Sequence, residues 1–356
     1  NGQKRQEGYF KYNRQDSLYT EWFETGKKKV EGEYNEDQAV NFWRYYYRDG
    51  RLKSVEETRS QENYLWEFYL PDSTHTQIVI EGKGEMVTYY TTGRVKEWYN
   101  YMDGLKEGPF EEYSIYGYSA LKGEFRGGLK HGKWEYAYYT GDPEKISNYK
   151  DGLLHGAYQY FYDNGTVYID GQFVNGEKEG EWTWFTNRGT KDMKGIFKKG
   201  QQHGEWIYWY PTGELSYNAH YTEGVKTGNW IYLYKNGNKF KEGTFADNLK
   251  NGEWKTWYED GTILMEGNYS EGMEEGEWRN YWENGKLKNK ASFESGELDG
   301  EWLSFYPNGN QNIIGHYSSN MKLGEWGEFF ENGKPKARST YKLFKLNSKR
   351  NYGYTK

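Results

Sequence analysis

The sequence lacks several features on which common protein classes depend. It has no cysteine, which excludes disulfides, thiolate catalysis and cysteine-based zinc sites. It has no run of 18 apolar residues, so we expect no transmembrane helix. Its 47 basic and 53 acidic residues are mixed and leave a net charge of −6. Without a basic patch we predict no nucleic-acid partner, and the charge weakens any attraction to an anionic membrane.

Aliphatic residues and proline are also scarce. Only 35% of residues are hydrophobic and only 6 are proline, yet 20% are aromatic, with 38 Tyr, 16 Trp and 45 Gly. Low hydrophobicity can indicate disorder, but disordered chains are poor in aromatic residues. We therefore expect a folded protein whose core is made mainly of rings rather than of Leu, Ile and Val.

A 24-residue repeat runs through the chain. The tripeptide GEW recurs at regular intervals, and its glycine is taken here as position 1 of a unit. Eleven units, separated by ten equal intervals, begin at Gly84, Gly108, Gly132, Gly156, Gly180, Gly204, Gly228, Gly252, Gly276, Gly300 and Gly324. Less regular units begin at Ser17, Asn41 and Asn63, and residues 1–16 match the second half of one more unit. Because the chain starts within a unit, we expect further sequence upstream of Asn1.

The repeat predicts the organisation of the chain. Residues 1–345 form one continuous array of about 14 and a half units. Within it, residues 1–16 are the half unit, 17–83 are degenerate and 84–345 are regular. Residues 346–356 form a basic C-terminal tail.

Each unit is predicted to be one β-hairpin. The first half is rich in aromatic residues and strand-like, and the second half returns as a strand to position 18. Asn-Gly and Asp-Gly recur at positions 9 and 10, where they favour a two-residue type I′ turn. These dipeptides begin at Asn164, Asn236, Asp260, Asn284, Asn308 and Asn332. A glycine-containing loop near position 21 leads to the next unit.

A two-residue turn determines which positions face each other. It pairs position 7 with 12, position 3 with 16, and position 1 with 18. Position 16 is often glycine and position 18 is always Tyr or Phe in the regular units, so rings would cover glycines at positions 16 and 1. Positions 1, 3, 5, 7, 12, 14, 16 and 18 share one face. Its predicted structural ladder consists of Trp134, Trp182, Trp206, Trp230, Trp254, Trp278, Trp302 and Trp326.

Position 6 lies on the opposite face and is still often aromatic. The residues concerned are Phe161, Phe185, Trp209, Trp257, Tyr281, Phe305 and Phe329. They could pack against their own hairpins, or they could form a surface that binds a partner, since Tyr and Trp are enriched at interface hot spots. The sequence favours neither, and we take these residues as candidates for partner binding.

The unit resembles the MORN repeat, in particular the bacterial variant called YwqK-like. The resemblance rests on KDGLLHGAY from Lys150, on KKGQQHGEW from Lys198 and on the YDNG and YPNG turns, and it covers the chain to about residue 345. The motif fades at residues 60–83 and from Leu346 onward. The resemblance implies an all-β fold, an elongated single-layer antiparallel ribbon of hairpins. Two strands per unit give ~9.6 Å per repeat, or on the order of 130 Å for fourteen units.

No residue pattern predicts catalysis, a metal or a cofactor. His75 lies near Asp72 in a degenerate segment, without a nucleophile context. His131, His155 and His203 all occupy position 24, where neighbouring units would hold them ~10 Å apart, too far for one zinc ion. The acidic residues at position 2 are expected to form a solvated row. They are Glu181, Glu205, Glu253, Glu277, Glu301 and Glu325.

We therefore predict a non-enzymatic scaffold that presents a long aromatic surface to protein partners, as a subunit of a larger bacterial assembly. An alternative is a glycan-binding protein of the cell surface or envelope, because bare Tyr and Trp faces suit sugar rings. The family resemblance also implies an antitoxin-like partner of one toxin. The absence of cysteine favours the bacterial envelope or secretion without deciding the compartment. The sequence does not decide whether the chain forms a homo-oligomer.

Overall fold

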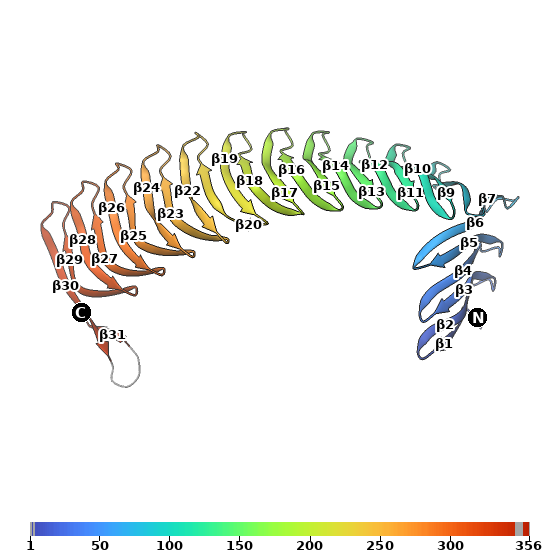
Figure 1. The fold of residues 1–356 in the computed structure, drawn as a ribbon, viewed down its shortest axis with the longest axis horizontal. Coiled ribbons are helices and arrows are strands. Elements are labelled where there is room, and N and C mark those ends of the chain that lie inside the picture. The colour runs from blue at the N-terminus through green and yellow to red at the C-terminus, as the bar shows by residue number, and fades with distance from the viewer. Residues whose placement is uncertain (1, 3, 346–351, 356) are drawn as a thin grey trace. The chain divides into compact units, whose positions relative to one another are not determined.

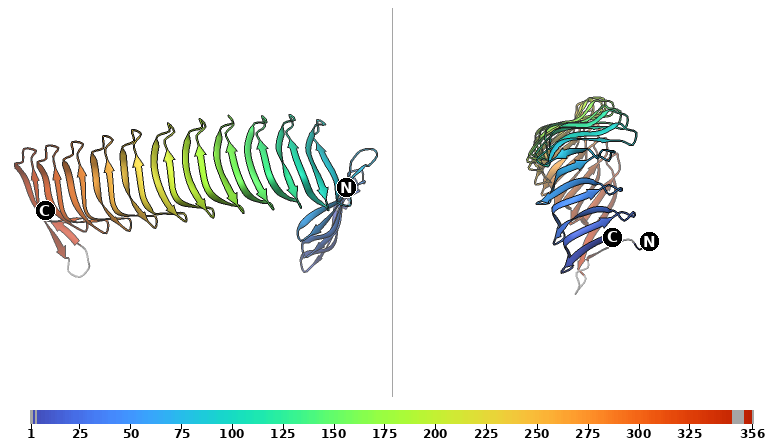
Figure 2. Two further views of the ribbon diagram at one scale, coloured as in Figure 1. Left: turned by 45° about the horizontal axis from the view of Figure 1, so that its top comes forward. Right: turned by 90° about the vertical axis from the view of Figure 1, so that its right-hand side faces the viewer.

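The computed structural model describes residues 2, 4–345 and 352–355. These residues form β-strands joined by turns, and none of them forms a helix. The chain divides into two compact units. Unit 1 comprises Asn1–Val167 and Gln172–Glu177, and unit 2 comprises Tyr168–Gly171 and Lys178–Lys356. Within each unit, hairpins follow one another in sequence order as antiparallel strands (Figures 1 and 2). The predicted all-β ribbon of tandem hairpins is thus confirmed, while the predicted domain boundaries stay a prediction.

The strands are short and similar in length. The first fifteen are β1 (Gln6–Lys11), β2 (Arg14–Trp22), β3 (Lys28–Asn35), β4 (Gln38–Tyr46), β5 (Leu52–Arg59), β6 (Glu62–Tyr69), β7 (Gln77–Ile80), β8 (Lys83–Tyr89), β9 (Val95–Met102), β10 (Leu105–Tyr113), β11 (Ser119–Arg126), β12 (Leu129–Ala137), β13 (Pro143–Lys150), β14 (Leu153–Phe161) and β15 (Val167–Val174). The others are β16 (Glu177–Phe185), β17 (Lys191–Lys198), β18 (Gln201–Trp209), β19 (Leu215–Thr222), β20 (Val225–Lys226), β21 (Gly228–Leu233), β22 (Lys239–Ala246), β23 (Leu249–Trp257), β24 (Ile263–Ser270), β25 (Met273–Tyr281), β26 (Leu287–Glu294), β27 (Glu297–Phe305), β28 (Gln311–Ser318), β29 (Met321–Phe329), β30 (Pro335–Lys345) and β31 (Tyr352–Thr355).

The pairing within a repeat unit agrees with the predicted register over most of its length. In the hairpin of β23 and β24, Gly252 faces Tyr269 and Trp254 faces Gly267, so positions 1 and 3 pair with 18 and 16 as predicted. The predicted pairing of position 7 with 12 is wrong. Trp257 at position 6 faces Ile263 at position 12, because a bulge shifts the register near the turn. The bulge lies beyond the tryptophan, so side chains near position 3 still alternate between the two faces as predicted.

The turn at positions 9 and 10 explains this shift, and it is not the predicted type I′ turn. The Gly261 N–H donates to the Tyr258 carbonyl (3.0 Å), and the Tyr258 N–H donates to the Thr262 carbonyl (2.8 Å). Gly261 has a φ of +93°, whereas Asp260 does not enter the left-handed region. This is a type I turn closed by a glycine bulge. Asp260 suits it because its carboxylate accepts the Thr262 N–H (2.8 Å), which lowers the pKa of Asp260.

The type I′ turn lies instead between repeat units, at positions 20 and 21. Asp247 and Asn248 between β22 and β23 have φ values of 49° and 68°. After this turn a bulge at the start of the next unit gives Gly252 a φ of +74°. Its added Cβ would meet only the Thr244 hydroxyl, at 3.2 Å. The predicted cover of position 1 by the ring at position 18 is therefore wrong. Glycine is favoured there by its φ and not by a ring above it.

The backbone conformation at position 1 also tests the repeat register that was assigned to the irregular upstream units. Ser17 and Asn41 occupy this position in the degenerate units, and both have positive φ values, 71° and 58°. Asn tolerates this conformation better than most residues. The repeat register proposed for these two units from sequence is therefore consistent with their backbone conformation.

Neighbouring units are joined by hydrogen bonds at both edges of the ribbon. At the type I′ edge, the Gly272 N–H donates to the Lys250 carbonyl (2.9 Å), and equivalent bonds recur along unit 2. At the opposite edge, the position 7 side chain donates to the position 6 carbonyl of the next repeat, as from Tyr258 to Tyr281 (2.9 Å). No repeat unit could satisfy these groups alone, so each hairpin depends on its neighbours.

The type I′ turns allow a stabilising substitution. Glu223 precedes Gly224 in the turn between β19 and β20 and has a φ of 51°, which glutamate adopts poorly. Replacing Glu223 with Asn should raise the free energy of unfolding by about 0.5–1 kcal/mol. Urea denaturation would measure the gain. Glu259→Asn is the control, since this exposed turn residue has no positive φ, and an equal gain there would contradict the explanation.

The ribbon of unit 1 changes direction at the short strand β7 (Figure 1). Here the turn between β9 and β10 reaches back to β6, since the Leu65 N–H donates to the Gly104 carbonyl (2.8 Å). Leu65, Val79 and Met86 are buried at this corner, with Val79 fully enclosed. The corner coincides with residues 60–83, where the sequence motif fades.

The predicted tail is only partly described. Residues 346–351 and 356 lie outside the described residues. Tyr352–Thr355 form β31, which pairs antiparallel with the end of β30 from Lys342 to Lys345. This pairing extends the hairpin pattern by one strand.

Candidate interaction surface

The predicted tryptophan ladder lies in the most buried part of the fold. Seven of its eight members are 0–6% exposed, and Trp302 is half-buried. Six of the eight rings lie over the glycine at position 16 of the preceding repeat unit and not over that of their own hairpin, whereas Trp230 and Trp302 follow Ala219 and Ala291. A Cβ added to Gly243 would lie 2.5 Å from the Trp254 Cγ and closer still to two other ring carbons. The expected cover of glycine within one hairpin is therefore wrong, and the ring joins one hairpin to the next.

The tryptophans alternate with the rings at position 18. Around Trp254, Phe245 packs edge to face with a centroid distance of 5.2 Å and an angle of 90°, and Tyr269 does so at 6.1 Å and 85°. The Trp254 indole N–H donates to the Thr244 carbonyl (3.1 Å). Edge-to-face packing of this kind adds about 0.5–1.5 kcal/mol per pair beyond area burial. The ladder therefore gives the ribbon a continuous aromatic core within each of the two compact units.

A lysine at position 23 covers this core, which our sequence reasoning missed. Lys130 lies 4.1 Å from the Trp134 ring centroid and Lys178 lies 4.5 Å from that of Trp182. Burial lowers the pKa of Lys178. The signal was present in the sequence, because lysine often occurs four residues before the tryptophan. The lysine chains close the outer side of the rings and leave little apolar surface on this face.

The seven candidate residues at position 6 lie on the second face, which is the one opposite the ladder. All seven are half-buried, and their neighbours are charged. The Tyr281 hydroxyl donates to the Glu266 carboxylate (2.7 Å), and Lys191 lies 5.7 Å from the Trp209 ring. Lys239 lies 5.5 Å from the ring of Trp257. Phe161, Phe185, Phe305 and Phe329 occupy equivalent positions on their hairpins. The rings are thus partly packed by their own repeat units and partly open.

Four of the six position 2 carboxylates on this face, those of Glu181, Glu253, Glu277 and Glu301, form ion pairs with lysines. Glu181 pairs with Lys194 (2.8 Å), and Glu277 pairs with Lys290 (2.8 Å). The hydrogen bond from Lys290 lowers the pKa of Glu277. A carboxyl whose pKa is lowered is unsuited to general acid catalysis near neutral pH.

Two of the four histidines noted in the sequence contact backbone groups, whereas the buried Nδ1 atoms of His131 and His203 have no hydrogen-bond partner among the described residues. His155 accepts a hydrogen bond from the Asn175 N–H (3.4 Å) in the turn between β15 and β16, and Glu179 does the same for Lys199 (2.9 Å) in the turn between β17 and β18. The His75 Nε2 contacts the Leu52 carbonyl oxygen at 2.6 Å. Within the described part of the chain, no group of three potential ligands could hold a metal ion, and no helix could cross a membrane.

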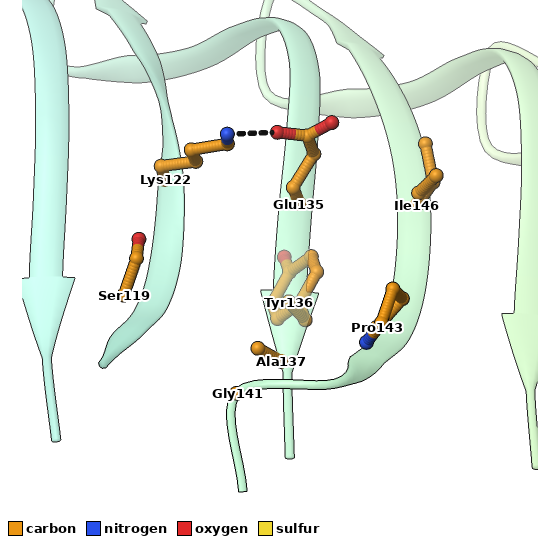
Figure 3. Close-up of a pocket in the computed structure, with 8 residues that line it drawn as sticks. All are labelled: Ser119, Lys122, Glu135, Tyr136, Ala137, Gly141, Pro143 and Ile146. Carbon is orange, nitrogen blue, oxygen red and sulfur yellow. Dashed lines mark ion pairs between the residues drawn. The ribbon is translucent and has the colours of Figure 1, made fainter. Parts of the chain in front are cut away.

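The second face of β8–β13 in unit 1 is hollowed. One hollow of about 240 Å³ forms where Ala137 occupies position 6 in place of a ring. In Figure 3, Ala137 and Gly141 lie at one end of it and the Lys122–Glu135 ion pair (2.7 Å) lies at the other. A second hollow, of about 560 Å³, has Tyr89, Trp98 and Tyr113 among its lining residues. The alanine at position 6 was the signal that could have located the first hollow.

Exposed apolar side chains lie at the turns next to these hollows. Tyr89 is 58% exposed, Tyr116 67% and Tyr139 78%. Together with the hollows they give the second face of β8–β13 an uneven apolar surface. It combines rings, recesses and charged groups, which is the composition of protein interfaces rather than of an enclosed reaction site.

Comparisons with known proteins agree with the repeat. The MORN repeat variant model matches six times, at residues 154–175, 202–223, 250–271, 274–295, 298–318 and 322–343. No curated protein is detectably similar in sequence.

Two solved structures align along most of the chain but only weakly. The TcdB2-TccC3-Cdc42 crystal structure gives a TM-score of 0.18 at 10% identity, covering 91% of this chain and 18% of that one. The Photorhabdus luminescens Tc holotoxin pore gives 0.17 at 11% identity, also covering 91% and 18%. This chain thus spans less than a fifth of either, and such scores support no inference about function. The repeat matches and the tandem hairpins together identify the chain as a member of the MORN repeat variant family.

Proposed function

We propose that the chain is a non-enzymatic scaffold that binds protein partners through its second face. The observation that carries this proposal is the hollowed surface of β8–β13, where recesses lie beside exposed tyrosines. Rings that fit pockets and exclude water supply most of the binding energy at protein interfaces. The half-buried position 6 rings of each unit are proposed as further contact residues.

The two faces differ in what they leave available. The ladder face uses its rings within the fold, because its tryptophans are nearly all buried and lysines cover them. The second face keeps rings that are half open and rimmed by ion pairs such as Lys122–Glu135. Contacts repeated at a fixed spacing could bind one partner at several points, which raises affinity through avidity.

Site-specific photo-cross-linking in the source cells tests this proposal. Benzoylphenylalanine at Ala137 should yield discrete adducts with another protein, because Ala137 lies at one end of the hollow, next to the place that a partner side chain is proposed to enter. The matched control is Ala246, which is exposed at the end of β22. Adducts at Ala137 that are absent at Ala246, and that diminish when Tyr89 and Tyr116 are replaced with Ser, would support the proposal.

Two results would overturn it. Equal adducts at both sites would mean that contact is unspecific. The absence of any protein adduct, combined with retention of the chain on immobilised polysaccharide, would favour glycan binding by the same rings.

A further inference from the structure

The usual pair of residues at positions 16 and 3 is altered between β5 and β6 in unit 1. In most repeat units a glycine or another small residue at position 16 lies beneath the aromatic side chain at position 3 of the next unit, as Gly123 does beneath Trp134. At the equivalent place between β5 and β6, Glu56 faces Leu65. Both members of the pair have changed. The large ring has become a smaller side chain, and the residue beneath it has gained a carboxyl group.

This exchange opens a pocket at the corner of unit 1. The pocket has a volume of about 440 Å³, and its walls include Tyr45, Phe68, Tyr99 and Tyr101 around Glu56. The Ser54 hydroxyl donates to the Glu56 carboxylate (3.3 Å). Four aromatic side chains thus surround one carboxyl group, on the ladder face and away from the second face proposed for protein partners.

Glu56 forms no ion pair among the described residues, although exposed Lys53 also lines the pocket. In the described part of this segment the ion pairs are Arg51–Asp49 and Arg59–Glu57, and Glu56 belongs to neither. Burial raises the pKa of Glu56, which the Ser54 hydrogen bond and the charge of exposed Lys53 only partly oppose. A partly buried carboxylate without a cationic partner is unfavourable, so binding a cation would stabilise it.

Besides burial, the charge of Glu56 raises the pKa values of two neighbouring tyrosines. Burial, followed by the charge of Glu56, raises the pKa of Tyr45. Burial, Tyr99 and then Glu56 raise that of Tyr101. The rings therefore stay neutral near pH 7, and their faces carry the negative potential that attracts cations. Lys106 already lies 4.1 Å from the Tyr99 ring centroid, so these rings accept a cation in the structure itself.

We propose that this corner pocket binds a small organic cation, an alkylammonium or quaternary ammonium compound, with Glu56 as the counter-charge and the three tyrosines and Phe68 as an aromatic cage. A tyrosine cage with one carboxylate suits such a ligand because the rings replace its weak hydration and the carboxylate neutralises its charge. The site does not depend on the protein partner proposed above, since it lies on the other face.

The test is calorimetric titration of the full chain with choline and with n-butylammonium. At least one of them should bind with 1:1 stoichiometry. The uncharged isostere 3,3-dimethyl-1-butanol should not bind measurably, because it fills the cage without its charge. Glu56→Gln should weaken binding by about tenfold or more, and the matched control Glu85→Gln, on the second face, should leave it unchanged.

A double variant separates a lost site from a lost fold. Glu56→Gly combined with Leu65→Trp restores the regular pair of the repeat, so it should keep the melting temperature and the circular dichroism while abolishing binding. The proposal is overturned if neither cation binds, if the alcohol binds as well as choline, or if Glu56→Gln or the double variant binds as the natural chain does.

Discussion

Replacing Gly243 with alanine is expected to cost about 1–3 kcal/mol of the local stability of unit 2, which is the usual cost of adding a methyl group to a packed core. The new methyl group would overlap the Trp254 ring, because that ring lies directly on the Gly243 backbone. Neither strand can withdraw while β22 and β23 stay paired, so the ring must leave its site. Hydrogen exchange of the β22 and β23 amides would measure the loss where it occurs.

Two controls define the cause of this effect. Gly237 has a φ of +86° and open space around it, so Gly237→Ala should cost about 1–2 kcal/mol through backbone strain alone. In a chain that already carries Trp254→Ala, the change at Gly243 should be almost neutral, because the atom it collides with is gone. A full loss in that background would show that the ring is not the reason for glycine at position 16.

Replacing Trp254 with alanine should cost more, about 3–5 kcal/mol. The side chain is 3% exposed, donates to the Thr244 carbonyl and touches rings on both sides, so its removal leaves a cavity and breaks two aromatic contacts. Because each hairpin contacts only its neighbours, the loss should be concentrated in β22–β24. Hydrogen exchange resolved by strand would show the range of the effect.

The loss of stability predicted for Trp254→Ala can be compared with the loss at Trp302, the half-buried residue of the ladder. Trp302 follows Ala291 at position 16 and not glycine, and it is the one ladder residue that is only half-buried. Trp302→Ala should therefore cost about half as much as Trp254→Ala, in line with the apolar area removed. Equal losses at the two sites would mean that burial does not determine the contribution of each ring.

The two candidate sites differ in how far the sequence could indicate them. The second face followed from the alternation of strand residues, and the row at position 6 was visible as a pattern. The hollow at Ala137 and the corner pocket at Glu56 are departures from that pattern. A departure can be noticed in the sequence, but whether it leaves a recess depends on how far the neighbouring strands and rings move to fill the space.

The sequence alone determined that this protein is a stack of hairpins, because a strict period of 24 residues with rings at alternate positions is compatible with few other folds. It also determined that Trp254 faces Gly267 across its own hairpin, since strand alternation leaves only one register for that face. Tertiary structure decided that the same ring lies on Gly243, and that Asp260-Gly261 forms a bulged type I turn. The physical reason is that bulges change the register by one or two residues without disturbing the repeat, so one sequence pattern fits several offsets. Only packing between hairpins selects among them.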